Sequence, residues 1–196
     1  MSQFPTAFTH PEACREDLKN VLDTHLSELI SSPSPQLWVP PDLLPVTAQA
    51  QESGLVPGSF AGFPHGHHDT LVKAAEARLA VQHGAGAIAV VLPPDLRQDP
   101  NAALSELVML REAVPQPVRL SLLLTGTGSG SQELLRMSAR AGVDSVILQV
   151  EHAQPPTLEL KVLQETALGL ELFAPLSQAL EVSSWPNVQR CWWQSD

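Results

Sequence analysis

One stretch of the sequence, residues 59–92, carries the pattern of a strand, a helix and a second strand. The apolar run SFAGFP comes first, and the apolar run AIAVVL follows after a stretch long enough to form one helix. Between them, Asp69 and Thr70 are residue types that begin helices, and Gly84 is the type that ends them. The residues that recur with the spacing of one helix face are Leu71, Ala74, Ala75, Arg78 and Leu79. The pattern predicts a βαβ unit, whose two strands lie parallel in one sheet.

The rest of the chain repeats this alternation of helices and strands. Further helices are predicted at 11–30, 41–54, 101–114, 132–141, 157–168 and 175–182. Further strands are predicted at 36–39, 118–124, 145–150, 170–174 and 188–193, with an eighth at 3–10. Most of these strands are apolar without alternation, which is typical of a parallel sheet covered on both faces. The order predicts one domain over 1–196, either a closed parallel barrel or a doubly wound sheet.

Composition narrows the classes of partner. The formal net charge is −10 and the chain has no basic run, which argues against binding to nucleic acid or to an anionic membrane surface. No apolar run approaches the roughly 18 residues of a membrane span. The two cysteines, Cys14 and Cys191, lack metal-binding spacing, and the N-terminus lacks the pattern of a signal peptide. We therefore expect a cytoplasmic protein with reduced cysteines and no cofactor.

The βαβ unit also resembles the deoxyribose-phosphate aldolase family. That family carries Gly-Phe-Pro-x-Gly, a Thr, Lys-x-x-Glu-Ala and then Gly-Ala before an apolar strand. The matching residues are Gly62, Phe63, Pro64, Gly66, Thr70, Lys73, Glu76, Ala77, Gly84 and Ala85. The segments THPEACREDL, LWVPPDLLP and RMSARAGVDSVI resemble other parts of the family pattern. The resemblance implies an α/β fold, a compact (β/α)8 TIM barrel. Because Asp196 follows directly on the last predicted strand, we expect no C-terminal helix after that strand. The resemblance also implies a carbon–carbon lyase of sugar-phosphate metabolism.

The positions where the family carries out its chemistry depart from its pattern. The family's Schiff-base lysine follows a stretch that is AGVDSV here, and the next residue is Ile147. The resemblance assigns the family's aspartate to Ala89, and its second lysine to Phe173 or Glu171. The Gly-Gly and Gly-Ser turns that hold the substrate phosphate in the family are also absent from the sequence. A Schiff base needs an amine with a lone pair, so none of these side chains can replace the lysine.

The lysines of the chain lead to the same expectation. Lys19, Lys73 and Lys161 are its only lysines, and each lies within a predicted helix. The helices of a barrel form its outer ring, while catalytic groups sit at the carboxyl ends of the strands. We therefore expect three solvated lysines and a degenerate barrel with a binding or scaffolding role. The alternative is a carbon–carbon lyase that uses other residues, with acid/base or metal assistance.

Other polar residues are candidates for the barrel mouth. His65, His67 and His68 follow one strand, and imidazole is the commonest zinc ligand. No further ligand has a clear spacing to them, so the simpler interpretation is local hydrogen bonding without a metal. Glu151 and His152 follow a later strand and could form an acid/base pair, or be an ordinary polar loop. Asp95 is a similar candidate after a third strand. Binding of a small-molecule ligand and formation of a homo-oligomer are both compatible with the sequence.

Overall fold

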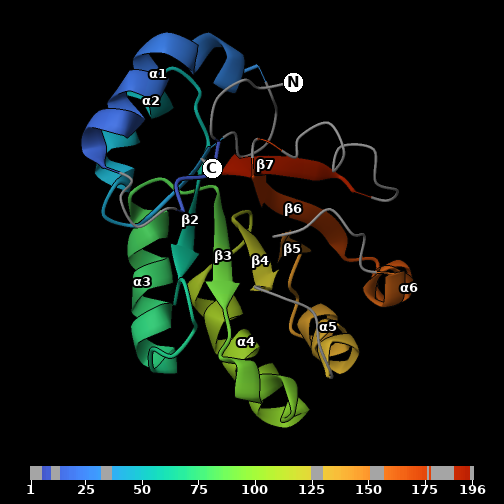
Figure 1. Ribbon diagram of the computed structural model, residues 1–196. Helices are drawn as coiled ribbons and strands as arrows, with labels where there is room; N and C mark the ends of the chain where they lie inside the picture. Colours follow the sequence, from blue (N-terminus) through green and yellow to red (C-terminus); the bar gives the residue numbers. More distant parts are fainter. Residues whose placement is uncertain are drawn as a thin grey trace.

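Seven parallel strands form one curled sheet in the order β1 to β7 (Figure 1). The computed structural model describes residues 6–9, 14–31, 37–124, 130–150, 157–175, 177 and 188–194, without the side chains of 157–160, 193 and 194. The strands are β1 Leu37–Val39, β2 Pro57–Ala61, β3 Ala87–Val91, β4 Arg119–Leu124, β5 Ser145–Gln149, β6 Gly169–Pro175 and β7 Arg190–Gln194. The predicted parallel sheet is therefore confirmed, and the fold is of the (β/α)8 barrel type.

Helices connect the strands and cover the outer face of the sheet (Figure 1). The α-helices are α1 Arg15–Leu29, α2 Ala48–Glu52, α3 Thr70–Gln82, α4 Pro100–Ala113, α5 Ser131–Arg140 and α6 Thr157–Thr166. Two 3-10 turns, η1 Leu44–Thr47 and η2 Pro94–Arg97, precede α2 and α4. The caps act as expected, since the Asp69 carboxylate accepts a 2.9 Å hydrogen bond from the Leu71 N–H at the start of α3. None of the described helices is long and apolar enough to cross a membrane.

Three predicted elements differ from the structure or fall outside it. The predicted helix 41–54 is split into η1 and α2, and Pro45 in its first turn lacks the N–H that a longer helix would use. Of the predicted strand 3–10, only residues 6–9 are described, and they contain a parallel bridge between Ala7 and Trp38. That bridge lies beside β1, where an eighth strand would pair. The predicted helix 175–182 lies almost entirely outside the described residues.

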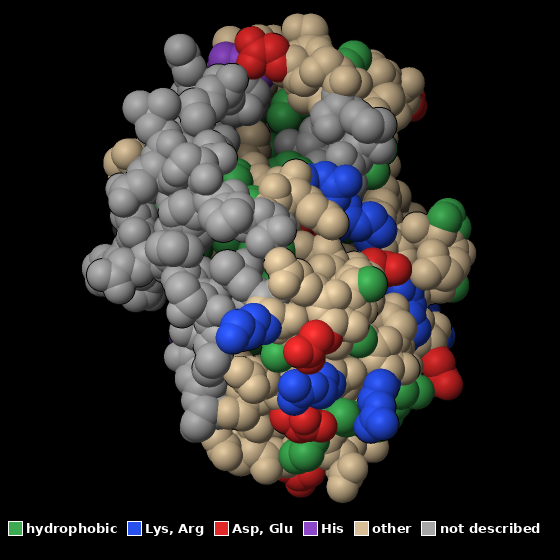
Figure 2. Space-filling model, turned by 90° about the vertical axis from the view of Figure 1, so that its right-hand side faces the viewer, with side chains coloured by type: hydrophobic (Ala, Val, Ile, Leu, Met, Phe, Trp, Pro, Cys, Tyr) green, Lys and Arg blue, Asp and Glu red, His purple; other side chains and the backbone are tan. Residues whose placement is uncertain are grey.

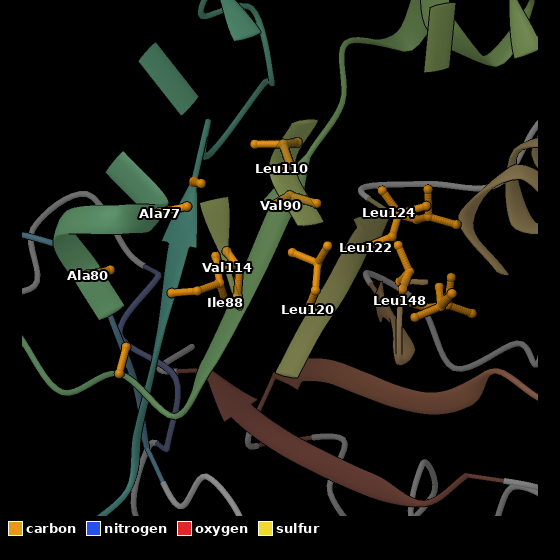
Figure 3. Close-up of a cluster of buried hydrophobic side chains, with 14 of the residues drawn as sticks. Ala77, Ala80, Ile88, Val90, Leu110, Val114, Leu120, Leu122, Leu124 and Leu148 are labelled. Carbon is orange, nitrogen blue, oxygen red and sulfur yellow. The ribbon is translucent and has the colours of Figure 1, made fainter. Parts of the chain in front are cut away.

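The sheet is buried on both faces, as its apolar strands predict. On β3, Ile88 and Val90 belong to the core between sheet and helices, while Ala87, Ala89 and Val91 belong to a second core inside the curl. Figure 3 shows the outer core, in which Ile88 and Val90 lie with residues of the neighbouring strands and helices. The labelled neighbours are Ala77, Ala80, Leu110, Val114, Leu120, Leu122, Leu124 and Leu148.

Candidate functional site

Apolar side chains form one buried cluster inside the curled sheet. Its members are Ala7, Trp38, Phe60, Ala87, Ala89, Val91, Leu123, Ile147, Phe173 and Trp192. Trp38 lies at the centre, with its ring centroid 5.7 Å from that of Phe60 and 5.7 Å from that of Phe173. The centroid of Trp192 is 6.0 Å away and nearly perpendicular, so residues from the two ends of the sheet meet across the interior. Such edge-to-face contacts stabilise closely packed aromatic groups.

The structure brings Ala89, Ile147 and Phe173 together in this cluster. Each of the three side chains is fully buried. An apolar group in such a position needs no hydrogen-bond partner, so the interior is stable without any polar function there. No lysine belongs to the cluster. The assignment of these positions to the catalytic residues of a family rests on the sequence pattern.

A polar layer lies next to this cluster, at the amino-terminal ends of the strands. The fully buried carboxylate of Glu171 forms an ion pair with Arg119 and accepts a 3.3 Å hydrogen bond from Arg190 Nη1. Its other oxygen accepts a 2.8 Å hydrogen bond from Trp192 Nε1. The Ser145 hydroxyl donates to Glu171 at 3.1 Å, so four groups from β4, β5 and β7 surround one carboxylate on β6.

Sequence reasoning missed most of this layer. The sequence pattern offers Glu171 only as an alternative to Phe173, and it does not single out Arg119, Arg190 or Ser145. A signal is nonetheless present, because each of the three is the first residue of its strand. The residue two positions further along β5, Ile147, faces the same interior, as the period of a strand requires. Polar residues at the same level of neighbouring strands can therefore meet inside a barrel.

Burial affects both arginines of the polar layer. Desolvation lowers the pKa of the Arg119 guanidinium, the nearby charge of Arg190 lowers it further, and Asp144 acts in the opposite direction. Desolvation also lowers the pKa of Arg190. Burial disfavours the charged form of a guanidinium group. The ion pairs with Glu171 offset part of that cost for Arg119 and Arg190.

The expectation of three solvated lysines is wrong for Lys73. Lys19 and Lys161 are exposed, but the Lys73 side chain is fully buried. Its ammonium forms an ion pair with Glu106 of α4 and donates a 2.7 Å hydrogen bond to the Gly66 carbonyl. The buried positions of α3 are Lys73, Ala77 and Ala80. The face of α3 that contains Leu71 and Leu79 therefore points outward, and the face that contains the paired Lys73 packs inward.

The family-like motif holds the loop that follows β2. Lys73 of α3 donates a hydrogen bond to the Gly66 carbonyl of this loop. Glu76, three residues further along α3, accepts a 2.7 Å hydrogen bond from the Gly62 N–H. Gly62 and Gly66 both have a φ of +75°, a region that favours glycine. A Cβ on Gly66 would lie 2.5 Å from the Leu92 backbone carbon, so no larger residue fits there. In this chain the motif residues Lys73 and Glu76 bind backbone atoms of the loop.

The histidine-rich loop does not gather into a metal site. His65, His67 and His68 are all exposed, and the ring centroids of His65 and His67 are 6.5 Å apart. His68 Nδ1 lies 4.0 Å from a Glu76 carboxylate oxygen. Asp95 lies in the turn η2 after β3 and is also exposed. Within the described part of the chain, no three His, Cys, Asp or Glu side chains are placed to hold a metal ion. Glu151 and His152 lie outside the described residues.

Comparison with known proteins identifies relatives by sequence. No family model matches the chain. The deoxyribose-phosphate aldolase of Corynebacterium glutamicum is 42% identical over 116 residues, which are 58% of this chain and 50% of that protein. The enzyme of the same name from Corynebacterium jeikeium is 36% identical over 143 residues, which are 69% of this chain and 57% of that protein. The chain thus spans about half the length of the curated relatives it matches.

Comparison with solved structures supports the fold. The deoxyribose phosphate aldolase from Aeropyrum pernix, described as tetrameric, superposes with a TM-score of 0.78 at 19% identity, covering 95% of this chain and 83% of that one. An aldolase called QR15 gives a TM-score of 0.73 at 16% identity, covering 96% of this chain and 88% of that one. The sequence motif, the identity to the corynebacterial proteins and the fold agree, and the chain belongs to the deoxyribose-phosphate aldolase family.

Proposed function

We propose that this barrel does not cleave carbon–carbon bonds through a lysine Schiff base, and that it is a degenerate family member with a binding or scaffolding role. The observation that carries the proposal is the apolar interior at Ala89, Ile147 and Phe173. These are the positions where the sequence pattern leads us to look for the family's charged groups. A Schiff-base site needs an amine, and none of these three side chains supplies one.

The lysines of the chain support the proposal. Lys19 on α1 and Lys161 on α6 are exposed residues of the outer helices. Lys73 is nearest to the loop after β2, but its ammonium is occupied by Glu106 and the Gly66 carbonyl. An ammonium held by a carboxylate has no lone pair to attack a carbonyl group. The placement of the three lysines thus supports a barrel in which none serves the reaction.

Borohydride trapping is expected to yield no adduct. The protein would be incubated with deoxyribose 5-phosphate and sodium borohydride, and its mass measured before and after. Reduction fixes any Schiff base as a stable amine, so a lysine-dependent aldolase gains the mass of the substrate fragment. The Corynebacterium glutamicum relative, treated in parallel, serves as the positive control. A reduced adduct on Lys19, Lys73 or Lys161 would disprove the proposal.

A cleavage assay with the same substrate, run without borohydride, tests the alternative, a lyase that uses other residues. The histidines of the loop after β2 lie at the carboxyl end of the sheet, where barrel enzymes keep their active sites. Cleavage of the substrate without a trapped adduct, lost in His67→Ala or with a chelator, would favour an acid/base or metal-assisted enzyme. Absence of cleavage in all these conditions supports the degenerate barrel.

We further propose that a scaffolding role involves self-association through α3 and α4. Five of the six exposed large hydrophobic residues in the described part of the chain lie on these neighbouring helices. They are Leu71, Val72 and Leu79 on α3, and Val108 and Met109 on α4. By contrast, Figure 2 views the side of the molecule that is on the right in Figure 1, and charged residues of both signs are interspersed there. The tetramer described for the Aeropyrum pernix relative makes a second copy the partner that we propose.

Leu79→Glu is expected to weaken self-association by at least about tenfold. Leu79 is 53% exposed, so a carboxylate is solvated in the monomer but would be desolvated in an interface through α3. The mass in solution would be measured by light scattering across a dilution series. Gln164→Glu, an exposed position on α6, adds the same charge away from the surface and should leave the mass unchanged. An equal effect of both variants, or a monomeric parent, would contradict this surface.

A further inference from the structure

Two arginines at the amino-terminal end of the barrel converge on a single oxygen atom. Arg119 Nη2 and Arg190 Nη1 both contact Oε1 of Glu171, the latter at 3.3 Å. Two groups that share one atom lie side by side, so both guanidinium groups are within reach of one small molecule. The second oxygen, Oε2, is already bound by Trp192 Nε1 at 2.8 Å. Glu171 therefore has little capacity left for the remaining donors of either arginine.

The charge of this group is not balanced. Arg119 and Arg190 carry two positive charges, and Glu171 supplies one negative charge. Asp144 does not make up the difference, because it is paired with Arg111 at 2.8 Å and accepts a hydrogen bond from the Leu120 N–H. Among the described residues of this group, a net positive charge thus remains, in a chain that carries −10 overall. Such a partly desolvated excess of positive charge attracts an anion.

One guanidinium nitrogen is also left without a partner. Arg119 Nη1 is buried and has no hydrogen-bond partner among the described residues. A buried N–H without an acceptor is costly, and in folded proteins such groups usually bind a water molecule or an ion. The Arg119 side chain is 23% exposed and that of Arg190 34%, so the two arginines are reached from the surface. The unpartnered nitrogen and the exposed parts of the two side chains thus belong to one cluster.

We propose that Arg119 and Arg190 form a binding site for a small tetrahedral oxyanion of the phosphate class. The planar fork of a guanidinium group matches two oxygens of such an anion, and its second negative charge suits two neighbouring arginines. Both arginines are the first residues of their strands, so the site opens at the amino-terminal end of the barrel. It lies at the opposite end from the histidine loop and does not depend on whether the barrel retains any catalytic activity.

Titration with inorganic phosphate tests the site. Phosphate should raise the melting temperature of the parent protein in a saturable manner, with chloride at equal ionic strength as the reference, and calorimetry should give a dissociation constant. Arg190→Gln should weaken phosphate binding by at least about tenfold, because a charge-assisted hydrogen bond and one positive charge are lost. Arg136→Gln is the matched control, since Arg136 is an exposed arginine of α5 that pairs with Glu133. It should bind phosphate as the parent does.

Two further measurements complete the test. Arg190→Lys keeps the charge but loses the fork, so it should bind severalfold more weakly, and it replaces Arg190→Gln if that variant does not fold. Phenyl phosphate distinguishes the source of the anion, because a site for free phosphate excludes it whereas a site for the phosphate group of a larger molecule binds it. Either outcome supports an oxyanion site. No saturable binding of either compound, or equal affinity in the parent and both Arg190 variants, overturns the proposal.

Discussion

Replacing Lys73 with methionine is expected to destabilise the fold by about 3 to 5 kcal/mol. Methionine matches the length of the aliphatic stem but cannot donate to the Gly66 carbonyl or to Glu106. The Glu106 side chain, only 10% exposed, would then be a buried carboxylate without its ion-pair partner. Removing one partner of a buried pair costs far more than removing both, since the remaining charge stays desolvated. Urea denaturation of parent and variant measures the change.

The double variant Lys73→Met, Glu106→Leu separates the charge from the packing. It removes both charges and leaves apolar groups of similar size between α3 and α4, so we expect it to be more stable than Lys73→Met alone. The Gly66 carbonyl still loses its donor, which leaves the double variant below the parent. A single variant as stable as the parent would mean that Lys73 and Glu106 reach water, in conflict with the burial described above.

Ile147→Lys is expected to cost about 3 kcal/mol or more at neutral pH. The position is fully buried in the apolar interior, where the charged form of lysine is disfavoured and its pKa is lowered. A folded pKa below the unfolded one means that the unfolded chain binds more protons. The loss of stability is then largest at low pH and shrinks as the pH rises toward the unfolded pKa. Denaturation at several pH values measures both the loss and its direction with pH.

Ile147→Leu is the control for this substitution. It keeps the position apolar at nearly constant volume, so its cost should remain below about 1.5 kcal/mol. If Ile147→Lys melts at the same temperature as the parent at neutral pH, the interior must admit water at this position. The apolar cluster around Phe173 would then be an open pocket, and the argument against catalysis would lose its main support.

The βαβ unit of β2, α3 and β3 could be predicted from the sequence because its signals are local. Asp69 caps α3 at its predicted start, and the two strands have the expected parallel pairing. The orientation of α3 could not be predicted, because the apolar pattern favoured Leu71 and Leu79 as one face and both are exposed. The partner that makes the burial of Lys73 favourable is Glu106, 33 residues further along the chain. Periodicity within one helix carries no information about such a partner.

The candidate site was predictable only in its apolar part. The family pattern assigned positions on three strands to Ala89, Ile147 and Phe173, and the structure buries all three in one cluster. The polar layer could not be predicted in this way. Arg119 and Glu171 are 52 residues apart in the sequence, and each resembles an ordinary polar residue at the beginning of a strand. Only the register of the parallel sheet brings them to one level inside the curl.

The hydrogen bonds between α3 and the loop after β2 have a consequence for protein engineering. Lys73 and Glu76 hold main-chain atoms, the Gly66 carbonyl and the Gly62 N–H, rather than the side chains of the loop. The loop's backbone path is thus fixed independently of the exposed residues His65 and His67. New side chains can be grafted at these two positions while the support beneath them stays intact. Metal-binding or reactive side chains could therefore be introduced by substitution in this loop, at the carboxyl end of the barrel.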